Sequence, residues 1–252
     1  MEENLSFTAE QVRFQHACDV IFHKQVQRDS IGTLSEKTLH AALKYYFEPD
    51  VSKQEVRIGR MVADIYNGDD IIEIQTRQFN KLRNKLDFLL PDYHVTIVHP
   101  IAVRKRIFQV DPETGAVSKG RLSPVKGSKY HIFPELYKIK SYLHNEHLHF
   151  CIMLLETEEY RIMPPQGKRR RRQKINSDKV PKTLIDEIYI NCVDDYVQLL
   201  PTDLPEEFTS NDFSVAAGIP VSLAQSALNI LFDTGTVTRV GKAGQAYLYR
   251  VK

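Results

Sequence analysis

Two carboxylates and one amide stand within short apolar runs, where polar side chains are costly to bury without a partner. Asp64 lies in the middle of the run from Met61 to Tyr66, and Glu73 and Gln75 lie in the next run, from Ile71 to Thr76. Magnesium and similar cations prefer oxygen ligands, and a protein often supplies one or two carboxylates. If the two runs pair, the sequence predicts a divalent-cation site on them.

The residues between the two runs favour such pairing, since Asn67-Gly68 is a typical tight-turn signal of a β-hairpin. Side chains alternate between the faces of a strand, so Glu73 and Gln75 share one face while Ile72 and Ile74 share the other. One face of the hairpin is therefore expected to carry the chemistry. The alternative is that the two carboxylates are ordinary edge-strand or ion-pair residues.

A third carboxylate is Glu36, in a helix expected over 34–47. It precedes Leu39 by three residues and Leu43 by seven, which places it on the apolar stripe of that helix. The alternative is that Glu36 only occupies the first helical turn, where the helix dipole favours an acidic residue.

Hydrophobic periodicity predicts the elements that must position these side chains. An N-terminal helix is expected over 8–29. The elements expected next are a helix over 34–47, strands over 54–58, 61–66 and 71–76, a helix over 78–89 and a strand over 93–98. Further strands are expected over 103–110 and 148–156, with a helix over 132–143 between them. The fold class is therefore α/β, in the order α-β-β-β-α-β from residue 34.

This order, together with Glu36, Asp64, Glu73 and Gln75, resembles the core of the PD-(D/E)xK nuclease superfamily over roughly residues 31–100. The resemblance implies a restriction-endonuclease-like mixed sheet and a Mg²⁺ (or Mn²⁺) site. Asp64 looks like the carboxylate of the second core strand, Glu73 like the first residue of the Glu-x-Lys pair, and Glu36 like the glutamate that several members add from the first helix. All four residues are then catalytic candidates, and the three carboxylates are metal-ligand candidates.

Two residues depart from the family pattern. Ala63 replaces the proline, and Gln75 replaces the lysine. A glutamine amide cannot take up a proton as a lysine of lowered pKa can. Some members carry Glu-x-Gln and remain active, and Arg77, Lys81 or Lys85 could reach the site from the following helix. The implied function is metal-dependent cleavage of nucleic acid, with DNA as the first expectation. The alternative is a non-catalytic nucleic-acid-binding protein or a protein-docking scaffold.

Charge is distributed unevenly along the chain of 252 residues. Residues 100–182 carry 18 basic and 8 acidic side chains, against 12 and 15 in residues 1–99 and 4 and 9 in residues 183–252. A basic segment of this kind favours a polyanionic partner, although a solvated charged face is the alternative. The candidate phosphate-binding residues are Arg104, Lys105, Arg106, Lys168, Arg169, Arg170, Arg171 and Arg172.

The pattern from Phe208 to Lys252 resembles a winged helix-turn-helix, with two helices and a two-stranded wing. Gln225 and Asn229 on the second helix could read base edges, and Arg239 and Lys242 on the wing could contact phosphates. Winged helices also serve as docking modules, so a protein partner at this segment is an open alternative.

The totals exclude several classes of protein. Cys18, Cys151 and Cys192 are scattered and odd in number, which argues against a disulfide framework. Zinc at His144, His147 and His149 is conceivable, but surface histidines are the preferred interpretation. No run is long enough to span a bilayer, so we expect a cytoplasmic protein with no membrane partner.

The expected division is an N-terminal helix at 1–30, a nuclease-like core with a basic β extension at 31–165, a basic linker or loop at 166–182 and a winged-helix domain at 183–252.

Overall fold

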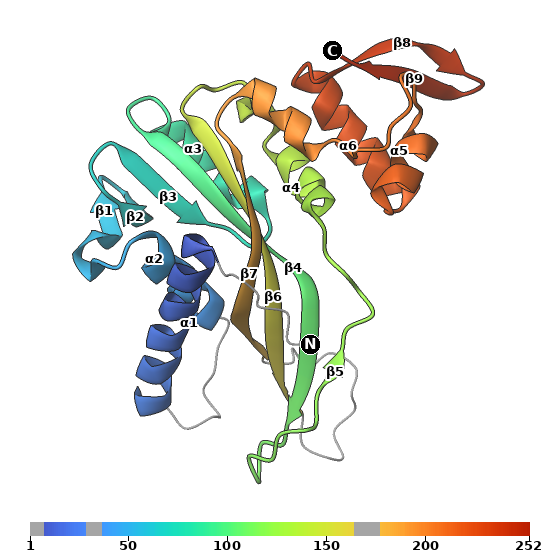
Figure 1. Ribbon diagram of the computed structural model, residues 1–252. Helices are drawn as coiled ribbons and strands as arrows, with labels where there is room; N and C mark the ends of the chain where they lie inside the picture. Colours follow the sequence, from blue (N-terminus) through green and yellow to red (C-terminus); the bar gives the residue numbers. More distant parts are fainter. Residues whose placement is uncertain (1–7, 29–36, 164–176) are drawn as a thin grey trace. The chain divides into compact units, whose positions relative to one another are not determined.

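A mixed sheet of seven strands forms the framework of the protein. The computed structural model describes residues 8–28, 37–163 and 177–252. The strands follow the order β1-β2-β3-β4-β6-β7, and β5 pairs with β4 (Figure 1). Their bounds are Gln54–Ile58 (β1), Met61–Tyr66 (β2), Asp70–Ile74 (β3), His94–Val110 (β4), Arg121–Leu122 (β5), Leu148–Ile162 (β6) and Ser177–Ile190 (β7).

The α-β-β-β-α-β order predicted from residue 34 is confirmed. Helices α1 (Ala9–Arg28) and α2 (Lys37–Phe47) precede β1, and α3 (Arg83–Leu89) connects β3 to β4 after a 3₁₀ turn at Phe79–Leu82. β2 and β3 are antiparallel, and β3 and β4 are parallel. A parallel pair needs a crossover connection, and α3 provides it. The sheet is therefore mixed at the point where the predicted site lies.

β4 differs from the prediction, which divided it into two strands over 93–98 and 103–110. It is one strand of 17 residues that continues through Pro100. Backbone groups of alternate residues face the same edge of a strand, so Pro100 faces the edge at which Val98 accepts the Gln75 amide. Because β3 ends at Ile74, the missing N–H of Pro100 interrupts no pairing with β3.

Two further segments differ from the expected secondary structure. Residues 177–182 were expected in a linker or loop, but they begin the strand β7. The helix expected over 132–143 is shorter, with α4 at Phe133–Lys138 flanked by 3₁₀ turns at Lys129–Ile132 and Lys140–Tyr142. Another 3₁₀ segment, Val193–Leu199, follows β7.

The last 43 residues form two helices and a hairpin, as the sequence predicts. Helix α5 (Ser210–Ala217) is capped by Thr209 and ends at Gly218, which has the left-handed φ of 62°. Helix α6 is Val221–Asp233, and β8 (Val237–Ala243) pairs with β9 (Ala246–Val251). α6 contacts α4, α5 and β8 (Figure 1).

The chain divides into two compact units. Among the described residues, the first comprises 8–28, 37–56, 102–127, 153–163 and 177–186, and the second comprises 57–101, 128–152 and 187–252. Cys18 is buried in the first unit and Cys151 in the second, and burial raises the pKa of each thiol to about 12. No single helix among the described residues is long and apolar enough to cross a membrane, and α5 and α6 meet that test only as a pair bent by 110°.

Candidate active site

The hairpin β2–β3 brings Asp64 and Glu73 onto the same face of the sheet. Ile65 pairs with Ile72, so the antiparallel register places Asp64 opposite Glu73. Asp64 Oδ2 accepts a hydrogen bond of 2.8 Å from the Ile74 amide, and the Asp64 amide donates to Glu73 Oε1 at 3.3 Å. These bonds fix both carboxylates against the backbone of the partner strand.

Glu73 is buried, with only 5% of its surface exposed, and a lysine from α3 accompanies it. Lys85 Nζ lies 2.5 Å from Glu73 Oε1 and also donates to the carbonyl of Val62. Burial raises the pKa of the Glu73 carboxyl to about 7, the charge of Asp64 adds to this, and Lys85 acts against it. The site thus holds a carboxyl group that exchanges a proton near neutral pH.

The start of the connection to α3 is fixed by a second set of polar contacts. Glu135 Oε2 accepts from the Phe79 amide at 2.9 Å, and Lys138 Nζ lies 2.6 Å from Glu135 Oε1. His99 packs edge-on against the Phe79 ring and lies 2.7 Å from the Gln75 carbonyl through Nδ1. Burial lowers the pKa of His99.

The other end of the helix rests on the turn before β2. Phe88 of α3 approaches Gly59 so closely that a Cβ atom at that glycine would lie 2.8 Å from the ring. Arg60 lies over the same ring, 5.4 Å from its centroid. These contacts determine where α3 runs and therefore where Lys85 reaches.

The other two catalytic candidates are Gln75 and Glu36. The Gln75 side chain donates through Nε2 to the carbonyl of Arg77 at 2.6 Å, so its amide hydrogen-bonds the backbone of the next turn. Glu36 lies outside the described residues. Within the described ranges, no group of three or more His, Cys, Asp or Glu side chains has an arrangement that could hold a metal ion.

Sequence reasoning named Lys85 only as one of three cations that could reach the site. The contacts of His99 and Glu135 were not anticipated. The sequence gives little indication of these contacts, because each residue bonds to a partner more than 20 residues away along the chain. The sequence marks Lys85 only as a polar residue on an amphipathic helix, which does not distinguish it from the other polar residues of that helix.

Two of the candidate phosphate-binding residues of the first unit have carboxylate partners. Arg104 lies 3.0 Å from Glu156, and Lys105 lies 3.0 Å from Glu159. Arg106 is exposed at its place in β4. The run of five cations at 168–172 lies outside the described residues.

The candidates in α6 and β8 also differ in their surroundings. Gln225 is exposed, whereas Asn229 Oδ1 accepts from Lys140 Nζ at 3.0 Å. The guanidinium of Arg239 lies over the rings of Phe232 and Tyr247, 4.4 and 3.9 Å from their centroids. Arg239 and Lys242 remain exposed and therefore accessible to a ligand.

The histidines near the start of β6 do not form a metal cluster with other described residues. His147 and His149 each contact the ring of His94, and their ring nitrogens lie within hydrogen-bond distance of the carbonyls of Leu90 and Glu146. His144 instead lies 3.5 Å from Asp233 of α6.

Comparison with known proteins places the chain in a family. Residues 37–191 match the family model described as a domain of unknown function, DUF8091. A protein of Treponema pallidum (strain Nichols), described as an uncharacterized protein, is 32% identical over 223 residues, which cover 88% of this chain and 87% of that protein. No solved structure gives a significant match. The chain therefore belongs to the DUF8091 family.

Proposed function

We propose that this chain is a metal-dependent, nuclease-like hydrolase that cleaves phosphodiester bonds in nucleic acid, with DNA as the expected substrate. The proposal is carried by one arrangement, the pair Asp64 and Glu73 on one face of β2–β3 with Lys85 Nζ at 2.5 Å from Glu73. It combines two oxygen-donor groups, at the positions where the PD-(D/E)xK resemblance predicts metal ligands, with a cation from the following helix.

The fold supports the same proposal at a coarser level. A mixed sheet in which β1, β2 and β3 are followed by a helix and a parallel β4 is what a restriction-endonuclease-like core requires. In the same way, α5, α6 and the β8–β9 hairpin have the order of a winged helix-turn-helix. We propose both identities, with the winged helix holding nucleic acid or a protein partner.

The residues present suit magnesium or manganese. These ions are often bound by one or two carboxylates, with the remaining positions filled by water and substrate phosphate. Asp64 and Glu73 would hold the ion, and the glutamate at position 36 is the candidate third ligand. Burial, and to a lesser degree the charge of Asp64, raises the pKa of Glu73, so a bound divalent cation would favour the ionised form of this carboxyl group.

The protein groups have distinct parts in such a reaction. When bound, the metal ion supplies the Lewis acidity that polarises a phosphoryl oxygen. Lys85 holds a positive charge where negative charge develops on the phosphate, and it takes over the electrostatic part of the missing motif lysine. Gln75 is bonded to the turn at Arg77, so it orders the backbone beside the site.

The test is cleavage of supercoiled, single-stranded and branched DNA with Mg²⁺ or Mn²⁺. We expect Asp64→Asn, Glu73→Gln and Lys85→Ala each to reduce cleavage at least about 100-fold, as is typical when a preorganised charge is removed. Lys81→Ala is the matched control, because Lys81 is exposed on the preceding 3₁₀ turn, and it should cleave like the wild type.

A gel-shift assay on the same proteins separates the proposal from its rival. Binding that persists in every variant, with no cleavage by the wild type on any substrate or metal, would mean that Asp64, Glu73 and Lys85 form only a structural ion-pair cluster. The protein would then be a non-catalytic binder.

A further inference from the structure

Charge is divided unevenly between the last two helices and the hairpin that follows them, all of which belong to the second unit. Residues 209–233, which contain α5 and α6, carry two acidic and no basic side chains. Residues 234–252, which contain β8 and β9, carry four basic and no acidic side chains. A polyanion would therefore be attracted to the hairpin rather than to the helices.

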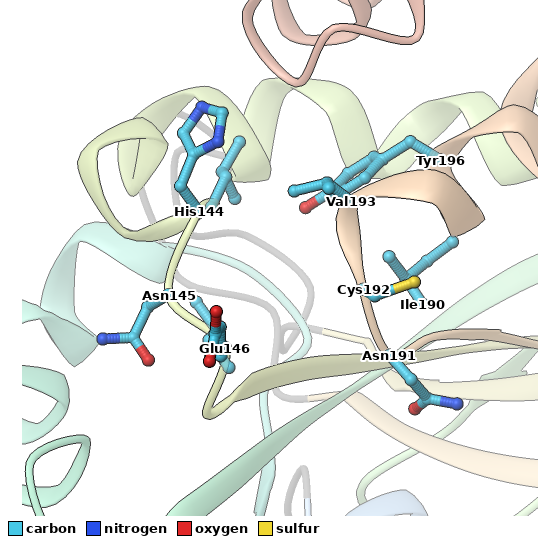
Figure 2. Close-up of a pocket in the computed structure, with 10 residues that line it drawn as sticks. His144, Asn145, Glu146, Ile190, Asn191, Cys192, Val193 and Tyr196 are labelled. Atoms are coloured by element: carbon cyan, nitrogen blue, oxygen red, sulfur yellow. The ribbon is translucent and has the colours of Figure 1, made fainter.

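Helix α6, which would read bases in the major groove if the segment acted as an ordinary helix-turn-helix, is engaged elsewhere. Lys140, which follows α4, donates to Asn229 at 3.0 Å and lies 3.0 Å from Asp233. His144, on one wall of a pocket of about 380 Å³ (Figure 2), lies 3.5 Å from the same aspartate. These contacts hold one side of α6 against the segment after α4, so Asn229 is not free to read a base edge.

A β-bulge in β8 brings two cations, Arg239 and Lys242, onto one face of the hairpin. Arg239 pairs with Tyr249 and Lys242 pairs with Tyr247, and the register shifts between Arg239 and Gly241. Side chains three residues apart on a regular strand point to opposite faces, but the extra residue of a bulge restores a common face. Both cations therefore share the face that carries the two tyrosines.

Four side chains on this face and on the adjoining helix form what we call the wing patch: Phe232 of α6, Arg239 and Lys242 of β8, and Tyr247 of β9. The Arg239 guanidinium lies over both rings, and Lys242 Nζ lies 5.3 Å from the Tyr247 centroid. Phe232 and Tyr247 keep 40% and 44% of their surface exposed. The rings hold the guanidinium in place, while the N–H groups at its rim remain available as donors.

The cations of the wing patch are not neutralised by carboxylates. Arg250, on the neighbouring strand, lies 2.5 Å from Glu207 and 3.8 Å from Glu206. Within the part of the chain that the structure describes, no carboxylate is paired with Arg239 or Lys242. The patch therefore combines positive charge with open aromatic surface.

We propose that the wing patch binds single-stranded nucleic acid. An unpaired base stacks on Tyr247, and Arg239 and Lys242 donate to the neighbouring phosphates. The bases of a duplex are stacked on one another and offer no face to such a surface, so the patch selects unpaired segments. This inference rests on the proposed action on nucleic acid, and it names the substrate class that the winged helix holds.

The first test is fluorescence anisotropy with the full chain in EDTA, so that no metal-dependent cleavage occurs. The ligands are a labelled single strand of mixed sequence and the same strand with abasic sites in place of its nucleosides. We expect the intact strand to bind at least about fivefold more tightly, because stacking on an aromatic ring requires a base. Equal affinity for the two strands would overturn the inference.

Two substitutions of Tyr247 test the stacking contact. Tyr247→Leu removes the ring and should weaken binding of the intact single strand at least about fivefold, while binding of the abasic strand and of the annealed duplex changes less than about twofold. Tyr247→Phe keeps the ring and should restore binding of the intact strand. Tyr137→Leu on α4 is the matched control, because Tyr137 is also exposed but lies outside the wing patch.

Two further variants separate the wing from the helix. Lys242→Gln removes a phosphate contact, so the intact and abasic strands should lose affinity alike, about twofold to fourfold at physiological salt. Gln225→Ala changes an exposed side chain of α6 and should weaken neither. Weaker duplex binding by Gln225→Ala, with no effect of Tyr247→Leu on any ligand, would show that α6 reads duplex DNA and would overturn the inference.

The outcomes also distinguish this inference from the proposed function. Binding that depends on neither the bases nor Tyr247, together with metal-dependent cleavage, would overturn the inference and leave the nuclease proposal intact. Base-dependent binding that is lost in Tyr247→Leu, with no cleavage under any condition, would support the inference and leave a non-catalytic single-strand binder. Absence of binding to every strand and duplex would overturn both.

Discussion

The proton on Glu73 is the most sensitive feature of the candidate active site. Its carboxyl is buried beside Asp64, and Lys85 offsets part of the resulting electrostatic cost. Because the pKa lies near 7, small changes in the surrounding charge decide whether the group is ionised at physiological pH. A divalent cation would compete with that proton, so metal affinity should rise with pH.

This pKa has a consequence for stability. Since the folded-state pKa of about 7 is above the ordinary value of 4.5, the native state holds a proton that the unfolded state has released. The stabilisation of the folded state by this proton is fully present below the pKa of Glu73 in the unfolded state, and it is lost as pH rises through 7. Relative to Glu73→Gln, the wild type should lose up to about 3 kcal/mol of unfolding free energy between pH 5 and 8.

Urea unfolding of both proteins across that pH range measures the difference. His99, whose pKa is lowered by burial, acts in the opposite direction, but it is present in both proteins and cancels. Parallel stability curves for wild type and Glu73→Gln would contradict the raised pKa.

At this scale, sequence reasoning succeeded where strand alternation alone decides the outcome. Asp64 and Glu73 share a face because side chains alternate along each strand and a short turn fixes the register of the hairpin. Lys85 was not distinguished from Lys81 or Arg77, because its reach depends on how α3 packs against the hairpin.

The elements around the site depend on one close approach. Gly59 lies in the turn between β1 and β2, and its φ of 55° is one that residues with a Cβ rarely adopt. The Phe88 ring occupies the space that a side chain at Gly59 would need. α3 therefore rests directly on backbone, and any added atom there would displace the helix that carries Lys85.

We expect Gly59→Ala to lower the unfolding free energy by about 2–3 kcal/mol, from backbone strain together with the steric conflict. Gly115→Ala is the control, since Gly115 has a φ of 70° and no atom within 4 Å of its Cβ position. Gly115→Ala should lower the unfolding free energy by about 1 kcal/mol, which is the cost of the backbone strain alone. Chemical denaturation of the two variants measures the difference, and equal losses would contradict the role of Phe88.

Element order was predictable because apolar periodicity and turn residues mark most boundaries. The continuity of β4 could not be predicted, because a proline normally breaks a strand. Pro100 is tolerated only because β3 ends before it would pair with Pro100. β7 was missed at its start because its first residues, Ser-Asp-Lys, lack strand propensity and gain their conformation from pairing.

For the whole molecule, the uneven charge distribution matters more than the net charge of +2. Arg104 and Lys105 are paired with glutamates, which reduces what they can offer a polyanion. We therefore propose that the run of five cations at 168–172 contributes most of the affinity for a polyanion.

Replacing all five residues of that run with serine should reduce the salt dependence of DNA binding. If each contacts one phosphate of a duplex, the slope of log K against log [KCl] falls by about 4 to 5. Fluorescence anisotropy over a KCl series measures the slope. Lys81→Ser, which removes one exposed charge elsewhere, should leave it unchanged, and a similar slope for the serine variant would exclude the run from the interface.

The two buried thiols also make the chain its own reporter of local opening. Cys18 and Cys151 lie in different compact units, and burial slows the reaction of each thiol with a reagent until its surroundings open. Under native conditions, each reaction rate therefore reports the free energy of one opening event. Equal rates with the same urea dependence would show that the two units unfold as one cooperative body, and distinct rates would give each unit its own stability.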